Sequence, residues 1–209
     1  MLTYLFLSTF YAAGLFSTEP AVPPFTGECN RLSSTTCTLY LSSTIESEDT
    51  YIPLYKIFSD LTKDDKIVLH LSGSGGSAAA LLRLVHVIKS SGAELTVYVD
   101  GPVASAHAFL AIQANQLIAA PHTYFLFHRV ALGSGETIEE TCEAEKGKLD
   151  RGLDKKAKCI TNLTTEMKII DDILAKYAGT VLTKSELSRM AKGEDVIILG
   201  AEIQKRINK

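Results

Sequence analysis

The sequence lacks several features that would place it in common functional classes. It has no tryptophan, and its 21 Lys and Arg residues, against 24 Asp and Glu, give a net charge of −3 and form no stripe interleaved with aromatic residues. Nucleic-acid binding therefore has no electrostatic support. The phosphate-binding pattern GxxxxGK[ST] and the dinucleotide pattern GxGxxG are both missing, so nucleotide binding is not predicted either.

Cysteine is scarce, and its spacing argues against a metal site. The four cysteines form no Cys-x-x-Cys pair, and no histidine lies near them at the spacing of zinc ligands. We therefore expect no metal and no cofactor. Cys29 and Cys37 bracket a turn-like stretch, whereas Cys142 and Cys159 flank a charged one. Two local disulfides, which suit an oxidising compartment, and free buried thiols both fit this spacing.

The N-terminus is apolar and free of charge over residues 2–16. This run is too short for a comfortable membrane span and has the length of a signal-peptide core, although no Lys or Arg precedes it. We take residues 1–22 as an apolar N-terminal segment and expect an exported, periplasmic or membrane-associated protein. A buried N-terminal element of a cytoplasmic protein is the alternative.

The rest of the chain, residues 23–209, has the size and patterning of a single α/β domain. Apolar alternation predicts strands at 36–43, 66–72, 94–100, 116–121 and 123–128. Helical spacing predicts helices at 50–65, 77–92 and 105–115. This alternation of strand and helix favours a parallel sheet. A charged stretch near 136–158 predicts a helical arm, followed by helices at 167–177 and 185–195.

Ser105 is the first candidate for chemistry. Gly101 and Pro102 make a sharp turn from strand to helix before it, and small Ala104 and Ala106 flank its hydroxyl. The N–H groups at a helix start point outward, where they could stabilise a developing oxyanion. The ordinary interpretation of such a serine is a helix N-cap.

A glycine turn and a histidine accompany the serine. In GSGGS (73–77), Gly75 and Gly76 would let the backbone approach a ligand closely and aim an N–H at it. His128 closes an apolar strand, from which it could face a serine at a neighbouring helix start. We expect the remaining histidines to be structural; at i+2 on the helix, His107 is expected to point away from Ser105. These are His70, His86, His107 and His122.

The segments LSGSGGS, GPVASAHAF and FLFHR resemble the Clp protease proteolytic-subunit family of the Clp/crotonase superfamily. The resemblance covers residues 36–130 and again 180–207. It implies an α/β fold, a Clp/crotonase-like spiral of ββα units with a C-terminal helical arm or handle. It also implies a set of site residues: Ser105 as nucleophile, His128 as general base, the Gly76 and Ala106 amides as oxyanion hole, and Gly75 and Ser77 as substrate-binding residues.

The resemblance places the third member of a triad near the C-terminus. In GEDVIILGAEI it implies that Asp195 orients and charge-stabilises His128, with Glu194 as the nearest competitor. Asp171 and Asp172 are expected on a solvated helix face.

The sequence also departs from the family pattern. Ser74 replaces the usual Pro of the glycine turn, and Arg129-Val130 replaces Gln-Pro after the histidine. The stretch around 136–158 is longer than expected for the handle that joins two rings. This weakens the case for a double ring and for an AAA+ unfoldase partner. His128-Arg129 after an apolar strand and the export-like N-terminal segment resemble the exported branch of Clp-like proteins more closely.

The predicted function is a serine endopeptidase that forms an acyl-enzyme on peptides or unfolded proteins and works as a homo-oligomer. Three alternatives stay open. The first is a Ser–Lys peptidase of the signal-peptide-peptidase type, with a buried lysine of lowered pKa as base: Lys146, Lys148, Lys155 or Lys156. The second is an acyl-CoA enzyme of the crotonase branch, and the third is a non-catalytic assembly or binding module on the same fold.

Overall fold

The computed structural model describes residues 25–31, 34–132, 137–146 and 153–209. The predicted N-terminal segment, 1–22, lies outside these residues. The chain forms two compact units, one of residues 1–127 with 197–209 and the other of residues 128–196. In the parts of the chain that are described, no helix combines the length and apolar character needed to cross a membrane.

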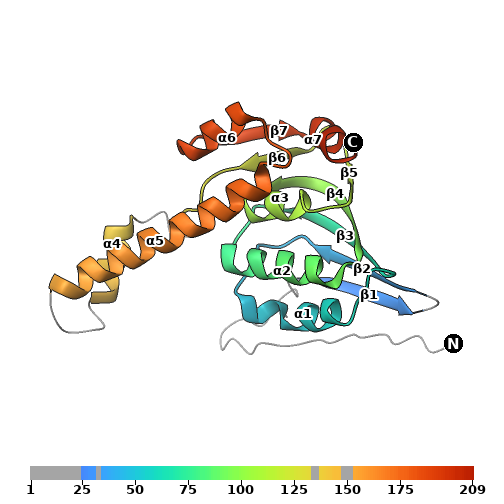
Figure 1. The fold of residues 1–209 in the computed structure, drawn as a ribbon, viewed down its shortest axis with the longest axis horizontal. Helices are drawn as coiled ribbons and strands as arrows, with labels where there is room; N and C mark the ends of the chain where they lie inside the picture. The colour runs from blue at the N-terminus through green and yellow to red at the C-terminus, as the bar shows by residue number, and fades with distance from the viewer. Residues whose placement is uncertain (1–24, 32–33, 133–136, 147–152) are drawn as a thin grey trace, which may run out of the picture. The chain divides into compact units, whose positions relative to one another are not determined.

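The first unit is built on a mixed sheet with the strand order β1-β2-β3-β4-β6-β7, with β5 paired to β4 (Figure 1). β1 and β2 form an antiparallel hairpin, while β2, β3, β4, β5 and β6 pair in parallel. The predicted α/β class is therefore confirmed. The strands are β1 (Thr26–Arg31), β2 (Thr35–Leu41), β3 (Lys66–Gly73), β4 (Glu94–Ala104), β5 (Gln116–Ala119), β6 (Tyr124–Phe127) and β7 (Val196–Leu199).

Alternating burial along the strands explains why they form where they do. In β3, Ile67, Leu69 and Leu71 are buried while the residues between them are more exposed. Side chains of a strand alternate between its faces, so the buried set lies on one face of the sheet. This face carries the core of the first unit, and its burial fixes the register of the strands.

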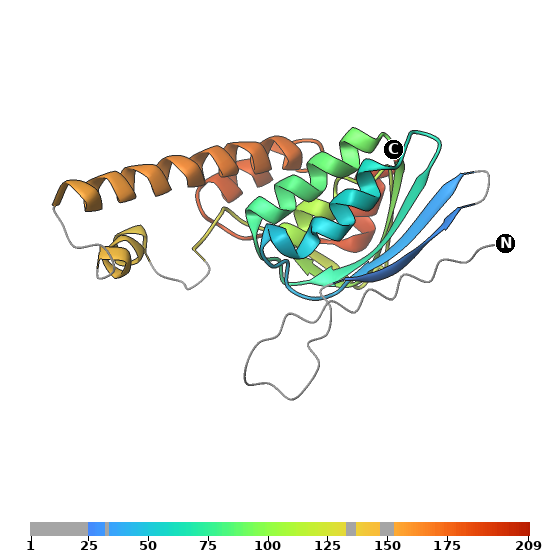
Figure 2. The ribbon, with the colours of Figure 1, turned by 90° about the horizontal axis from the view of Figure 1, so that it is seen from below.

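Helices α1, α2 and α3 lie on the same side of the sheet (Figures 1 and 2). Helix α2 begins where the Ser77 hydroxyl accepts a hydrogen bond from the Ala80 amide, 3.2 Å away, and it ends at Gly92 in the left-handed conformation. The helices of this unit are the short 3₁₀ helix η1 (Glu48–Tyr51), α1 (Ile52–Ser59), α2 (Ala78–Ser91), α3 (Ala106–Ala111) and α7 (Gly200–Ile207).

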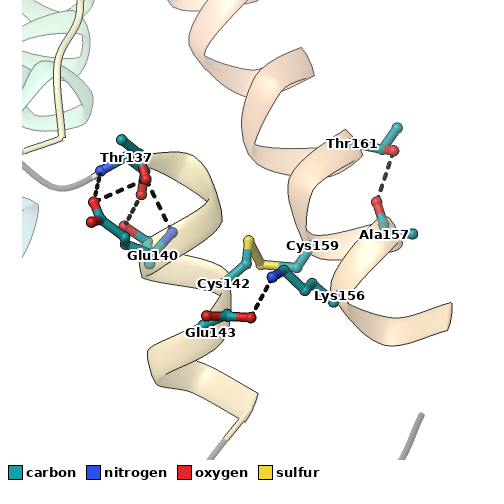
Figure 3. The surroundings of a disulfide bond; sticks show 9 residues. Thr137, Glu140, Cys142, Glu143, Lys156, Ala157, Cys159 and Thr161 are labelled. Carbon is teal, nitrogen blue, oxygen red and sulfur yellow. Dashed lines mark hydrogen bonds and ion pairs between the residues drawn. A yellow bond between two sulfur atoms is a disulfide. The ribbon is translucent and has the colours of Figure 1, made fainter. Parts of the chain in front are cut away.

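The second unit consists mainly of helices α4 (Ile138–Lys146), α5 (Leu153–Ala178) and α6 (Lys184–Ala191). The predicted charged arm is helical, and its second part continues without a break into the helix predicted at 167–177. A disulfide between Cys142 and Cys159 joins α4 to α5, with their Cα atoms 5.9 Å apart, and the ion pair of Glu143 with Lys156 lies beside it (Figure 3). This covalent link holds α4 against α5.

The second disulfide lies in the first unit, between Cys29 on β1 and Cys37 on β2. The two residues are directly opposite each other in the antiparallel hairpin, with their Cα atoms 4.0 Å apart. All four cysteines are thus paired, which decides between the two interpretations that their spacing left open.

Candidate active site

Ser105 occupies a strained turn between β4 and α3. Strand β4 continues to Ala104, past its predicted end at 100, because Val103 and Ala104 pair with Phe125 and Leu126 of β6. Ser105 follows at once with φ 52° and ψ −127°, and it is the one non-glycine residue with positive φ in the described chain. A side chain in this region costs about 1–3 kcal/mol, and such strain concentrates at functional sites.

The hydrogen bonds of Ser105 are those of its backbone. Its amide donates to the Leu126 carbonyl at 2.8 Å, and its carbonyl accepts from the Phe109 amide at 3.0 Å. The half-buried side chain makes no capping hydrogen bond, although Ser105 precedes α3 directly. Ser105 thus occupies the N-cap position without a side-chain cap, and its hydroxyl has no hydrogen-bond partner among the residues that the structure describes.

The structure brings the glycine turn against Ser105. A Cβ atom on Gly75 would lie 2.5 Å from the Cβ of Ser105 and 3.1 Å from its Oγ, so no other residue fits here without displacing the serine. Gly75 and Gly76 have φ values of 112° and 137°, in the region that favours glycine. Two segments about thirty residues apart thus meet at one hydroxyl.

Backbone N–H groups near Ser105 differ in their availability. The amides of Gly76 and Ala106, the two predicted oxyanion-hole donors, make no hydrogen bond to any residue that the structure describes. The Gly75 amide instead donates to His107 Nδ1 at 2.9 Å. All three hydrogen-bonding groups of Ser77 serve the fold, since its hydroxyl caps α2, its amide donates to the Ile45 carbonyl at 2.8 Å, and its carbonyl accepts from the Leu81 amide at 3.0 Å.

His107 is completely buried and does not face solvent as a base would. Burial lowers the pKa of its imidazole to about 4, because the charged form would lose its hydration. Because Nδ1 accepts the Gly75 N–H, the neutral ring carries its proton on Nε2. His107 is buried and bonds to the glycine turn, a contact that the sequence did not indicate.

His128 and Asp195 belong to the second unit. His128 is half-exposed, and its Nδ1 forms a short hydrogen bond with the carbonyl oxygen of Arg129. A carbonyl oxygen only accepts, so Nδ1 carries the proton and Nε2 presents a lone pair. This is the tautomer that a general base for serine requires.

Asp195 is exposed. Its backbone carbonyl accepts a hydrogen bond from Arg189 at 3.3 Å, while its carboxylate makes neither a hydrogen bond nor an ion pair within the described residues. No hydrogen bond joins it to His128. The role of Asp195 as the third member of a triad stays a prediction.

Asp171 departs from the expected solvated helix face. Its side chain is only 16% exposed, and both carboxylate oxygens are engaged. One oxygen accepts from the Val130 amide at 2.8 Å, and the other pairs with Arg129 Nε at 2.9 Å. Asp171 thus holds the segment that directly follows His128, whereas its neighbour Asp172 is exposed.

The lysine alternative gains no support from Lys156. This residue forms an ion pair with Glu143, and a base of lowered pKa would have to be free of such a carboxylate. Lys148 and the side chains of Lys146 and Lys155 lie outside the described residues. Within those residues, no group of three or more His, Cys, Asp or Glu side chains is placed to hold a metal ion.

Comparison with family models identifies the family of this chain. The model of the Clp protease family matches residues 33–174, more than half of the chain. The matched range contains the glycine turn, Ser105 and His128, but it ends before Asp195. No curated protein matches the chain.

Proposed function

This chain belongs to the Clp protease family, and on that premise we propose that it is a serine endopeptidase whose nucleophile is Ser105. Family membership indicates a serine peptidase of the Clp type, and the backbone of Ser105 is the observation that carries the proposal. Its strained conformation presents a hydroxyl that makes no capping bond, and the nearby amides of Gly76 and Ala106 have no hydrogen-bond partner among the described residues. A nucleophile and an oxyanion hole need this combination.

The proposed reaction runs through an acyl-enzyme. His128 Nε2 takes the proton of Ser105 Oγ as that oxygen attacks the peptide carbonyl, and the Gly76 and Ala106 amides stabilise the oxyanion. His128 then gives the proton to the leaving amine as the C–N bond breaks. Water, deprotonated by His128, attacks the acyl carbon, and the Ser105 hydroxyl is regenerated as the acid product leaves.

The proposed reaction requires two contacts from residues of the second unit. This unit must present His128 to Ser105, and the carboxylate of Asp195 must reach His128 Nδ1 in place of the Arg129 carbonyl. We propose that these contacts form in a homo-oligomer, because proteins of this family generally form oligomers. An AAA+ unfoldase is not part of the proposal.

We place this peptidase in an oxidising compartment, as an exported protein acting on peptides or unfolded proteins. The two disulfides support this location, because disulfides persist where thiols are not kept reduced. Growth of the full chain in an oxidising and in a reducing host, followed by thiol titration, tests it. Free thiols in protein from the oxidising host would contradict the proposal.

Labelling with a fluorophosphonate tests the nucleophile directly. We expect the full chain to gain one adduct, mapped to Ser105, and Ser105→Ala to gain none. Ser91→Ala is the matched control, since the hydroxyl that it removes donates to the Ile88 carbonyl and accepts from the Ala93 amide, and so has a structural role. A folded, assembled sample without an adduct would favour a non-catalytic module on the same fold.

The identity of the base is tested by two further variants. We expect His128→Ala to lose labelling and Lys156→Ala to keep it. The reverse result would establish the Ser–Lys mechanism. Hydrolysis of an acyl-CoA thioester that survives Ser105→Ala would instead indicate the crotonase type of chemistry.

A further inference from the structure

His107 takes no part in the proposed reaction, yet it lies directly under the glycine turn. Its ring lies against Gly73, where a Cβ atom would come within 2.8 Å of the imidazole Cε1. Its Nδ1 accepts the Gly75 N–H at 2.9 Å, and both partners are buried. The ring therefore occupies the space left by the missing side chain of Gly73 and bonds to the backbone of Gly75.

The glycine turn is held at two successive peptide groups. The Gly75 N–H belongs to the first and bonds to His107, and the Gly75 carbonyl belongs to the second and accepts from the Ile45 amide at 2.7 Å. The N–H and C=O of a trans peptide point in opposite directions. With its oxygen directed at Ile45, the second peptide directs the Gly76 N–H to the other side.

Ser105 and the hydrogen bond between Gly75 and His107 lie at the same end of helix α3. His107 follows Ser105 by two residues, and the backbone of Gly75 lies against the Ser105 side chain. The hydrogen bond between Gly75 and His107 therefore opposes movement of the turn away from the serine. The geometry couples the position of the free Gly76 amide to the position of the hydroxyl.

We propose that His107 is a positioning residue of the oxyanion hole, acting as the hydrogen-bond acceptor that keeps the glycine turn aligned with Ser105. This inference rests on the proposed function. The ring must stay neutral, since a proton on Nδ1 would face the Gly75 N–H with a second donor. Burial, which lowers the pKa of His107 to about 4, keeps that nitrogen unprotonated at neutral pH.

Two variants separate the hydrogen bond from simple packing. In His107→Asn the side-chain oxygen can accept the Gly75 N–H much as Nδ1 does, while His107→Leu fills the space without an acceptor. The probe is a fluorophosphonate, whose phosphonyl oxygen enters the oxyanion hole. We expect His107→Leu to lower the maximal labelling rate by about 10- to 100-fold, less than the about 10²- to 10³-fold cost of losing a donor outright.

The concentration of probe at half-maximal rate should stay the same in His107→Leu, because the defect concerns the adduct and not initial binding. His107→Asn should recover most of the rate. Equal losses in the two variants would reduce His107 to a core residue and overturn the inference, as would wild-type rates in both.

Amide hydrogen exchange at Gly75, followed by NMR in the full-length protein, keeps the inference testable should His107→Leu fail to fold. We expect slow exchange in the wild type and in His107→Asn; fast exchange in the wild type would contradict the hydrogen bond. Wild-type labelling separates the two failures. No adduct on Ser105 removes the proposed function and this inference with it, whereas labelling that is insensitive to His107→Leu removes the inference alone.

Discussion

The two units of the molecule hold the proposed catalytic residues in different ways. In the first, Ser105 and the glycine turn are fixed by backbone hydrogen bonds and a buried histidine, and two amides are left unoccupied. In the second, His128 bonds to its own neighbour and Asp195 is exposed without a described partner for its carboxylate. The fold thus preorganises the proposed nucleophile and oxyanion hole, whereas the proposed acid–base pair, His128 and Asp195, is not joined by a hydrogen bond.

The largest effect on the labelling rate is expected when His128, the proposed base, is removed. We expect His128→Ala to slow fluorophosphonate labelling of Ser105 by about 10³- to 10⁴-fold, because the hydroxyl loses its proton acceptor. His122→Ala is the control, as His122 is an exposed histidine in the turn before β6. Labelling of His128→Ala within a few-fold of the wild type would mean that the second unit supplies no base.

The next largest effect on labelling is expected from a change in the glycine turn of the first unit. In Gly75→Ala the new methyl group would clash with the Ser105 side chain, and we expect a fall in the labelling rate of about 10²-fold or more. Gly193→Ala is the matched control: Gly193 also has a positive φ, of 87°, but nothing lies within 4 Å of a Cβ there. Equal losses of labelling rate in Gly75→Ala and Gly193→Ala would contradict this explanation.

A pH effect on stability should also trace to the first unit. The pKa of His107 is lowered from 6.5 to about 4 in the folded chain, so below pH 6.5 only the unfolded chain takes up this proton. Stability present above pH 6.5 is thus lost as the pH falls towards 4, by up to about 3 kcal/mol. In urea unfolding, the free energy of unfolding of the wild type should fall more between about pH 6.5 and pH 4 than that of His107→Asn. Equal pH dependence of the two proteins would contradict it.

The smallest effect is expected in the second unit, at Asp171. Asp171→Asn weakens the bonds to Arg129 and Val130, and we expect about a tenfold slower labelling of Ser105, equivalent to about 1.4 kcal/mol. Exposed Asp172 provides the control, because Asp172→Asn leaves the segment after His128 untouched. A rate unchanged by Asp171→Asn would show that this segment needs no support.

The sequence predicts best where local signals and burial agree. Helix α2 begins and ends at Ser77 and Gly92 as predicted, because capping and apolar spacing coincide there. The sequence predicts too short a strand β4 because Gly101-Pro102 indicates a turn, yet pairing with β6 extends the strand to Ala104. It does not predict strand β1, since the residues of that strand lack apolar alternation and depend on the hairpin and its disulfide.

The residues of the candidate site also differ in how well the sequence predicts them. Ser105 and Gly75 could be singled out because a glycine turn and a strand-to-helix turn are local patterns. The bonds of His107 and Asp171 could not, because each depends on a partner more than thirty residues away. For Asp171, only the pairing with Arg129 and Val130 distinguishes it from adjacent Asp172.

The most direct test of the central claim is a crystal structure of the assembled protein with a phosphonate adduct on Ser105. We expect the phosphonyl oxygen about 2.7–3.1 Å from the amides of Gly76 and Ala106. We also expect His128 Nε2 within about 3.2 Å of Ser105 Oγ. An adduct whose oxygen faces neither amide, or a His128 ring remote from the serine, would contradict this claim.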